Sequence, residues 1–206
     1  MTRLVLVRHG ETTWHAENRY AGVTDVPLTP RGLDQARQLA DWARTAELAA
    51  IWSSDLTRAR LTAAPCAEAA GLPLQIDQRL RELNFGHAEG LTRTEMRQRF
   101  PEALQAFHAD PVNGHLPGGE DPAAAAERFT ACLHDIVGRY PDDRVLVIAH
   151  TTAIRLALCT LLGLPLPDYR RLFPSVHNCA LTEVRVEDGE IALLAFNTPI
   201  EALEPQ

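Results

Sequence analysis

The stretch Leu4-Val5-Leu6-Val7-Arg8-His9-Gly10-Glu11-Thr12 runs from four apolar residues directly into an arginine, a histidine and a glycine. An unbroken run of Val and Leu is typical of a parallel strand covered on both faces. Open parallel sheets bind ligands just beyond the carboxyl ends of their strands. The sequence therefore predicts that Arg8 and His9 lie where a ligand would bind. An arginine offers donors suited to phosphate or carboxylate, and a histidine can act as a base or a nucleophile.

The same pattern occurs a second time, near residue 150. Arg144-Val145-Leu146-Val147-Ile148-Ala149 is another apolar run, and it ends at His150-Thr151-Thr152. The residues that follow have the pattern of an apolar helix, which Gly163 closes. His150 is therefore expected beside a helix N-terminus, whose free N–H groups favour an anion.

The segments between and after these runs alternate between helix and strand patterns. One helix is expected after Thr29-Pro30, an N-cap residue followed by a proline suited to the first helical position. A second is expected after Ser53-Ser54-Asp55, which is interpreted as its cap. Short strands are predicted at 50–52, 74–76, 179–186 and 191–196.

This alternation predicts the α/β fold class, as a three-layer α/β/α arrangement with a mostly parallel central sheet and helices on both faces. The 206 residues are expected to form a single domain, 1–206, with a small inserted cap at about 86–120. The tail from Glu201 is expected to fray.

Composition argues against several classes of function. The net charge is −7 and no block of basic residues occurs, so we expect no nucleic acid and no membrane as a partner. The four cysteines are widely spaced without a CxxC motif, which predicts buried free thiols rather than a zinc site or a disulfide framework. With no long apolar window and no secretory leader pattern before the first strand, a cytoplasmic protein is expected. The sequence leaves the oligomeric state open, with a homodimer as one option.

A parallel sheet can bring the ends of the two apolar strands together across the intervening sequence. Arg58, which follows another predicted strand, could join Arg8, His9 and His150 there. Two guanidiniums, two imidazoles and a helix N-terminus in one pocket would suit a compact dianion such as phosphate.

These motifs resemble those of the histidine phosphatase superfamily, the phosphoglycerate mutase-like group. The resemblance covers nearly the whole chain and keeps the order of the family's motifs. The matching stretches are Leu6–Thr12 with its Arg-His-Gly triplet, Leu28–Gly32, Ser53–Ala59, Glu82–Gly86, Pro117–Glu120 and the strand that leads into His150.

The resemblance implies a role for each main residue. His9 would attack phosphorus and form a phosphohistidine. Arg8, Arg58 and His150 would hold the equatorial oxygens, where positioning and charge stabilisation do most of the catalysis. Glu82 would protonate the leaving alkoxide and then activate water. The resemblance implies no metal ion and no cofactor.

Two positions depart from the family pattern. Many members carry an asparagine six residues after the nucleophile, where this chain has His15, and Asn18 lies close by in the sequence. Many members carry a glycine after the second histidine, where this chain has Thr151. His15, Asn18 and Thr151 are therefore candidate phosphate-binding residues whose contribution the sequence leaves open.

The leading hypothesis is a metal-independent phosphomonoester hydrolase that acts on a small phosphorylated metabolite through a phosphohistidine. The short cap resembles the phosphatase branch, including α-ribazole phosphatase and broad-specificity phosphatases. Mutase-type phosphoryl transfer is the first alternative. A non-catalytic phospholigand-binding protein is the second, and the presence of both expected catalytic residues argues against it. Cap side chains would select the substrate, with Phe85, His87, Phe107 and His115 as candidates.

Overall fold

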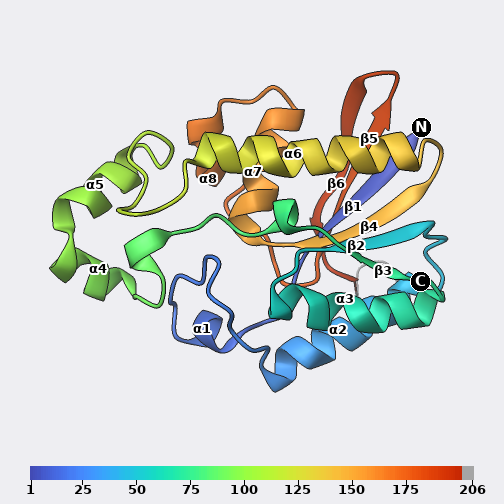
Figure 1. Ribbon diagram of the computed structural model, residues 1–206, viewed down its shortest axis with the longest axis horizontal. Helices are drawn as coiled ribbons and strands as arrows, with labels where there is room; N and C mark the ends of the chain where they lie inside the picture. The colour runs from blue at the N-terminus through green and yellow to red at the C-terminus, as the bar shows by residue number, and fades with distance from the viewer. Residues whose placement is uncertain (201–206) are drawn as a thin grey trace.

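The structure is a computed structural model that describes residues 1–200, so the tail from Glu201 lies outside the described residues. Its centre is a six-stranded sheet with the strand order β3-β2-β4-β1-β5-β6 (Figure 1). Helices cover both faces, which confirms the three-layer α/β/α prediction. The strands are β1 (Thr2–Arg8), β2 (Ala50–Ser53), β3 (Leu74–Ile76), β4 (Arg144–Ala149), β5 (Leu181–Glu187) and β6 (Glu190–Thr198). The helices are α1 (Thr13–Ala16), α2 (Pro30–Ala43), α3 (Thr57–Ala70), α4 (Arg93–Arg99), α5 (Pro101–Ala109), α6 (Pro122–Arg139), α7 (Thr151–Leu161) and α8 (Tyr169–Leu172), with short 3-10 turns η1 (Gln78–Leu80), η2 (Gly86–Ala88) and η3 (Leu166–Asp168).

The four strands from β3 to β1 are parallel to one another. β5 runs antiparallel to β1, and β6, at the edge of the sheet, runs antiparallel to β5. β1 and β4 are neighbours in the middle of the sheet, and their register pairs Arg8 with Ala149. The residues that follow these two strands therefore leave the sheet side by side. The two apolar runs of the sequence thus end at the same place in the fold.

The continuous apolar runs are explained by burial on both faces of the sheet. Val5 and Val7 pack with residues of α2 and α3, whereas Leu4 and Leu6 pack with residues of α6 and α7. All four side chains are fully buried. Each such side chain contributes about 1.5–3 kcal/mol by leaving water. The described residues include no helix with the length and apolarity needed to cross a membrane.

The cap predicted for α3 is wrong. α3 begins at Thr57 with Leu56 in the N-cap position, and no side chain of Ser53-Ser54-Asp55 caps it. Ser53 belongs to β2, and the Ser54 hydroxyl accepts instead from the Leu56 N–H at 3.3 Å. Asp25, more than thirty residues earlier, accepts from the Thr57 N–H at 3.0 Å. A distant loop therefore supplies the acceptor that the local sequence was expected to supply.

Two short helices, α1 and α8, were not expected from the sequence. α1 lies between β1 and α2, and α8 lies between α7 and β5. Each has four residues, which is too short for a helical repeat of apolar residues to show.

Between β3 and α6 the chain leaves the sheet and forms α4 and α5 at one end of the molecule (Figure 1, left). The Thr92 side chain accepts from the Glu95 N–H at 3.3 Å, and the Glu95 carboxylate accepts from the Thr92 N–H at 2.7 Å, a capping box that starts α4. Pro101 separates the two helices by starting α5. Phe107 of α5 is fully buried, with its ring centroid 6.3 Å from that of Tyr20. This contact ties the helices of segment 86–120 to the loop after β1.

Two glycines allow the start of α2 to lie directly against the chain after β1. A Cβ atom on Gly10 would lie 2.4 Å from the Gly32 carbonyl oxygen, and a Cβ on Gly32 would lie 2.1 Å from the Glu11 carbonyl oxygen. Both contacts are with backbone atoms, which cannot rotate away. The close approach helps to fix the loop that begins at His9.

We expect Gly32→Ala to destabilise the protein by roughly 1–3 kcal/mol, because the added methyl group forces backbone apart. Gly138→Ala is the matched control, since Gly138 also lies in a helix but a Cβ there meets nothing within 4 Å. That change should stabilise by about 0.5–1 kcal/mol through helix propensity. Urea unfolding measures both, and equal effects of the two substitutions would contradict the steric argument.

Candidate active site

The carboxyl ends of β1 and β4 place two histidines next to each other. The His9 N–H donates to the Ala149 carbonyl at 3.1 Å, which extends the β1–β4 pairing by one residue. The centroids of the His9 and His150 rings lie 5.0 Å apart. His9 is 3% exposed and His150 is fully buried. Residues 141 positions apart in the chain thus form one contact.

The hydrogen bonds of His9 fix which ring nitrogen carries the proton. Nδ1 lies 2.7 Å from the Gly10 carbonyl oxygen, which can only accept, so Nδ1 donates. The Arg58 Nε–H donates to Nε2 at 3.2 Å, and a guanidinium can only donate. Nε2 therefore carries a lone pair. Burial, and then the charges of His150 and Arg58, hold the pKa of His9 well below its usual 6.5, so the ring is neutral near pH 7.

Arg58 is fully buried at the start of α3 and is held by main-chain carbonyls. Its Nη1 donates to the Thr24 carbonyl at 2.8 Å and its Nη2 to the Gly22 carbonyl at 2.5 Å. These acceptors belong to the loop after α1, so that loop fixes the guanidinium beside His9. Burial lowers the pKa of Arg58, although carboxylates including Glu82 oppose this effect.

Arg8, the last residue of β1, precedes His9 at the same edge of the sheet. Its Nη1 donates to the Val176 carbonyl at 2.8 Å, its Nη2 contacts His15 Nε2, and its buried Nε has no partner among the described residues. Burial lowers the pKa of Arg8 to about 10, against the raising effect of Glu82. The arginine remains charged at neutral pH, and its buried Nε–H is not used by residues 1–200.

His150, like Arg8, has buried nitrogen atoms without a hydrogen-bond partner in the part of the chain that the structure describes. Neither of its two ring nitrogens has a hydrogen-bond partner within residues 1–200, although both are buried. Burial, and then the charges of Arg58 and Arg128, keep the pKa of His150 well below 6.5. An unpartnered buried polar atom costs free energy, and such atoms are a common feature of functional sites.

The Glu82 side chain is fixed by the N-terminus of α7. Its Oε2 accepts from the Thr152 N–H at 3.0 Å, and its Oε1 accepts from the Ala153 N–H at 2.9 Å and from the Leu83 N–H at 2.8 Å. The first turn of α7 has free N–H groups and a positive dipole end, so a carboxylate is favoured there. α7 thus places Glu82 close to the histidine that precedes the helix.

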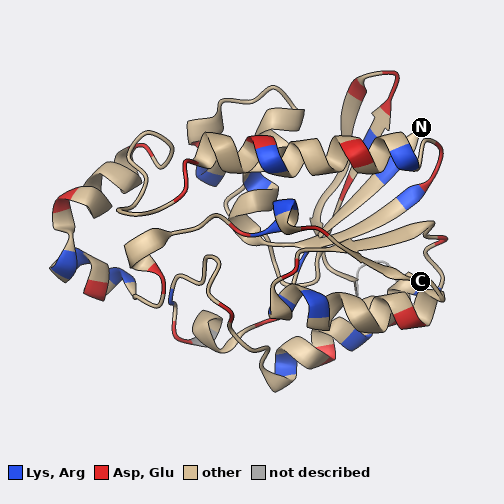
Figure 2. Ribbon diagram, in the orientation of Figure 1, with Lys and Arg blue, Asp and Glu red and all other residues tan. Residues whose placement is uncertain are grey.

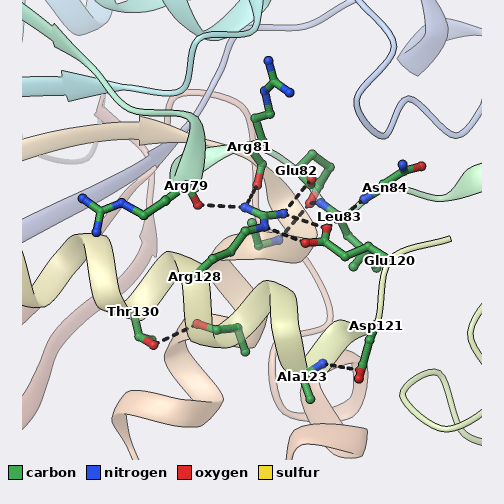
Figure 3. Close-up of polar contacts among 12 residues, drawn as sticks. Arg79, Arg81, Glu82, Leu83, Asn84, Glu120, Asp121, Ala123, Arg128 and Thr130 are labelled. Carbon is green, nitrogen blue, oxygen red and sulfur yellow. Dashed lines mark hydrogen bonds and ion pairs between the residues drawn. The ribbon is translucent and has the colours of Figure 1, made fainter.

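The backbone around Glu82 is held by Arg128 of α6 (Figure 3). Arg128 Nη1 donates to the carbonyls of Arg79 and Arg81 at 2.7 and 2.8 Å, and Nη2 donates to the Glu82 carbonyl at 3.0 Å. The same guanidinium forms two bonds of 2.7 and 2.8 Å to the Glu120 carboxylate. One arginine therefore anchors the Glu82 loop to a long helix of the scaffold.

These residues border a cleft of about 930 Å³. Its volume exceeds what a phosphate group needs and falls in the range of pockets for whole small molecules. The predicted site residues that line it are Arg8, His9, His15, Asn18, Arg58, Glu82 and Thr151. The remaining predicted residue, His150, does not line the cleft and is buried against the His9 ring.

The two departures from the family pattern also lie at the cleft. The His15 ring is stacked on that of His9, with centroids 5.6 Å apart. Its Nδ1 accepts from the Thr12 N–H at 3.1 Å. Burial, and then the charges of Arg8 and Arg58, lower the pKa of His15 to about 3. His15 is therefore a neutral ring that packs on the candidate nucleophile.

Among the substrate-selecting candidates, only Phe85 lines the cleft. Phe107 is buried in the core, and His87 and His115 are exposed outside the cleft. The sequence did not point to four further arginines that line it, Arg19, Arg93, Arg155 and Arg170. Only Arg155 had a detectable signal, because it lies one helical turn after Thr151. Within residues 1–200 no cluster of three His, Cys, Asp or Glu side chains is arranged to hold a metal ion.

Because the buried histidines are neutral, we expect the free energy of unfolding to decrease as the pH is lowered below 6.5. The unfolded chain protonates His15 near pH 6.5, whereas the folded chain does so near pH 3, so between these values the unfolded state binds more protons. Acidification therefore favours unfolding. His15→Asn should reduce the loss of unfolding free energy between pH 6.5 and 5 by on the order of 1 kcal/mol.

Urea unfolding at several pH values from 5 to 6.5 measures this slope, in a range where most carboxylates remain ionised. His134→Asn is the control, because His134 is exposed on α6. An unchanged slope in His15→Asn would show that His15 is protonated normally in the folded protein.

Comparison with known proteins places this geometry in a family. The model of the histidine phosphatase superfamily (branch 1) matches residues 4–199. A protein of Citrobacter koseri named probable phosphoglycerate mutase GpmB is 37% identical over 194 residues, which are 92% of this chain and 87% of that protein. The protein of the same name from Escherichia coli is also 37% identical, with the same coverage.

Solved structures are similar over almost the whole chain. Bacillus stearothermophilus YhfR is 31% identical with a TM-score of 0.91, over 97% of this chain and 98% of that one. A mycobacterial glucosyl-3-phosphoglycerate phosphatase is 30% identical with a TM-score of 0.87, over 96% and 99% of the two chains. The α-ribazole phosphatase of Shigella flexneri is 26% identical with a TM-score of 0.86, over 95% and 96%.

The resemblance seen in the ordered motifs is thereby confirmed. The chain belongs to branch 1 of the histidine phosphatase superfamily and is an enzyme of the histidine phosphatase type.

Proposed function

We propose that the protein is a phosphomonoester hydrolase that acts on a small phosphorylated metabolite through a phosphohistidine. The observation that carries this proposal is the state of His9. Its Nε2 has a lone pair, lies at the cleft and is flanked by the guanidiniums of Arg8 and Arg58. A neutral imidazole nitrogen beside fixed positive charge is suited to attack a dianionic phosphoryl group.

In the first step, His9 Nε2 forms a bond to phosphorus while the bond from phosphorus to the ester oxygen breaks. Glu82, protonated for this step, gives its proton to the leaving alkoxide. Arg8 and Arg58 stabilise charge on the equatorial oxygens. His150 does not line the cleft, but its ring lies against that of His9 and its nitrogens have no partner among residues 1–200, so the proposal assigns it as a further donor to these oxygens once phosphorus is bonded to His9.

In the second step, water attacks the phosphohistidine. Glu82, now ionised, takes a proton from this water, and the bond from Nε2 to phosphorus breaks. Inorganic phosphate leaves and His9 returns to its neutral form. The three N–H donors that hold Glu82 support this second step, because they hold a carboxylate in place, and the carboxylate is the form that takes the proton from water.

The proposal extends to the surroundings of the site. Segment 86–120 acts as a cap and belongs to the same single domain. The start of its helix α4 forms part of the cleft wall. Thr151 and Asn18 line the cleft and are available to bind substrate oxygens. A cytoplasmic location is supported by the four cysteines, which are all buried free thiols.

Mutase-type phosphoryl transfer is the second candidate, since the curated relatives at 37% identity are named probable phosphoglycerate mutases. A mutase must protect the phosphohistidine from water and return the group to a substrate. Incubation with 3-phosphoglycerate and a trace of 2,3-bisphosphoglycerate separates the two activities. Formation of 2-phosphoglycerate without free phosphate supports the mutase.

The decisive experiment is phosphate release from a panel of metabolite monoesters in the presence of EDTA. Wild type should hydrolyse some of the esters, because the charge stabilisation invoked comes from side chains. His9→Ala should lose essentially all turnover and the acid-labile phosphoenzyme. His108→Ala, an exposed histidine of α5, is the control. Tight phosphate binding without turnover by wild type would instead indicate a non-catalytic binding protein.

Glu82→Gln should slow hydrolysis most for esters with poor leaving groups. An alkoxide needs a proton as it departs, whereas an aryl oxide leaves with little help. Hence kcat should fall about 100-fold or more for alkyl phosphates and much less for p-nitrophenyl phosphate. Glu127→Gln, at an exposed position of α6, is the control. An equal loss for both kinds of ester would rule out general-acid catalysis by Glu82.

A further inference from the structure

Within residues 1–200, most arginines of the cleft lack an ion-pair partner, whereas most of the other arginines have one. All twenty basic residues of the chain are arginines, although the net charge is −7. Eleven of them form ion pairs with carboxylates in the described part of the chain, residues 1–200. Six arginines line the cleft, and of these only Arg19 is paired within that range, with Glu17 and Glu95. The other five have no ion-pair partner among residues 1–200.

Two of these five, Arg8 and Arg58, flank His9 and serve the phosphate group in the proposed function. A single phosphoryl group needs no more than this first set of donors. Arg93, Arg155 and Arg170 therefore remain as positive charges of the cleft that the proposed reaction does not use.

Arg155 is held with part of its guanidinium free. It lies on α7 one turn after Thr151, on the same side of the helix, and both residues line the cleft. Its Nη2 donates to the Pro174 carbonyl at 2.6 Å, whereas its buried Nε has no partner in the described part of the chain. Burial lowers the pKa of Arg155, Tyr169 and Glu82 oppose this effect, and the charge of Arg170 adds to it.

Arg170 of α8 is fixed in place by two aromatic side chains. Its guanidinium carbon lies 4.1 Å from the centroid of the Phe107 ring, and its Nε donates to the Tyr169 hydroxyl at 3.0 Å. Both aromatic side chains are fully buried. Stacking on a rigid ring leaves the outer N–H groups free while it limits the motion of the guanidinium. Such preorganisation reduces the entropy lost when a ligand binds.

Arg155 and Arg170 continue the positive charge of the phosphate site outward. α7 and α8 contact each other, and Figure 2 shows basic residues on both helices. The charge of Arg155 lowers the pKa of Arg8, and the charge of Arg170 lowers that of Arg155. Arg155 lies five positions after His150, the N-cap of α7, which corresponds to a rise of about 7.5 Å along the helix. A small metabolite can span such a distance.

A purely structural role does not account for this arrangement. The bond to Pro174 occupies only one N–H group of Arg155, and no carboxylate among residues 1–200 forms an ion pair with Arg155 or Arg170. Like charges that are partly withdrawn from water destabilise the fold unless an anion compensates them. The anion that fits is one that enters the cleft with the substrate.

We propose that Arg155 and Arg170 form a second anion site, which binds a carboxylate or a second phosphate carried by the alcohol part of the substrate. Arg93, exposed on α4, lies at the outer wall of the same cleft. This inference rests on the proposed hydrolase function for its reaction and goes further by naming the substrate class. The preferred substrates are small phosphate esters with two anionic groups.

Two pairs of esters test the inference, each differing in one anionic group. 3-Phosphoglycerate and glycerol 3-phosphate differ by a carboxylate, and glucose 1,6-bisphosphate and glucose 6-phosphate differ by a phosphate. In at least one pair, kcat/KM of wild type should be about 10-fold or more higher for the doubly anionic ester. The pair that shows the preference identifies the second group. Absence of a preference in both pairs overturns the inference.

Arg155→Gln and Arg170→Gln should each reduce that preference ratio about 10-fold, whatever the absolute rates become. Arg170→Lys should restore part of it, because a charge remains without the planar fork. Arg171→Gln is the matched control, since Arg171 is exposed on the same helix, pairs with Asp168 and does not line the cleft. A preference that survives both glutamine substitutions overturns the assignment to these residues.

Binding to His9→Ala, which removes the nucleophile, separates this inference from the proposed reaction. Calorimetry should give a Kd for the doubly anionic ester about 10-fold or more below that for its partner, and the additional Arg170→Gln change should abolish the difference. This result supports the second site even if wild type hydrolyses none of the esters, an outcome that would overturn only the hydrolase function. Equal Kd values for both members of each pair overturn the second site itself.

Discussion

The parallel pairing of β1 with β4 is the constraint on which the site depends. It places Arg8 opposite Ala149, so that the next residue of each strand is a histidine at the same edge of the sheet. The two strands are separated by about 140 residues, and no local signal could align them. Their alignment comes from apolar side chains on both faces, since a slip of one residue would turn every side chain to the opposite face. The geometry of the two histidines is therefore a consequence of core packing.

The fold concentrates positive charge at this edge and holds it with neutral acceptors. Arg58 is bound by the carbonyls of Gly22 and Thr24, and Arg8 by that of Val176. Main-chain carbonyls satisfy the donors without neutralising the charge, so the guanidiniums remain able to attract an anion. The same positive field, together with burial, keeps the pKa of His9 low. The buried positive charge at this edge of the sheet thus both attracts phosphate and helps to keep the His9 nucleophile neutral.

Glu82 illustrates how an irregular loop is made rigid. Its carboxylate is bound by N–H groups at the start of α7, and its backbone is bound by Arg128 of α6, which is itself paired with Glu120. The loop is therefore fixed by two helices on the same face of the sheet (Figures 1 and 3). Because both its carboxylate and its backbone are held, Glu82 can keep one position throughout a two-step reaction, and catalysis depends on such fixed geometry.

The sequence by itself determined the α/β layers and the residues that end the central strands, because continuous apolar runs, N-caps and turns are local features. It also pointed to the residues around the proposed nucleophile, but to fewer than half of the residues that line the cleft. The tertiary structure alone decided that Asp25 caps α3, that the His150 ring packs against that of His9, and that Arg155 and Arg170 extend the cleft. These relations join segments distant in the chain, where periodicity carries no information. They are set by how helices and loops pack over the sheet, which depends on the whole core at once.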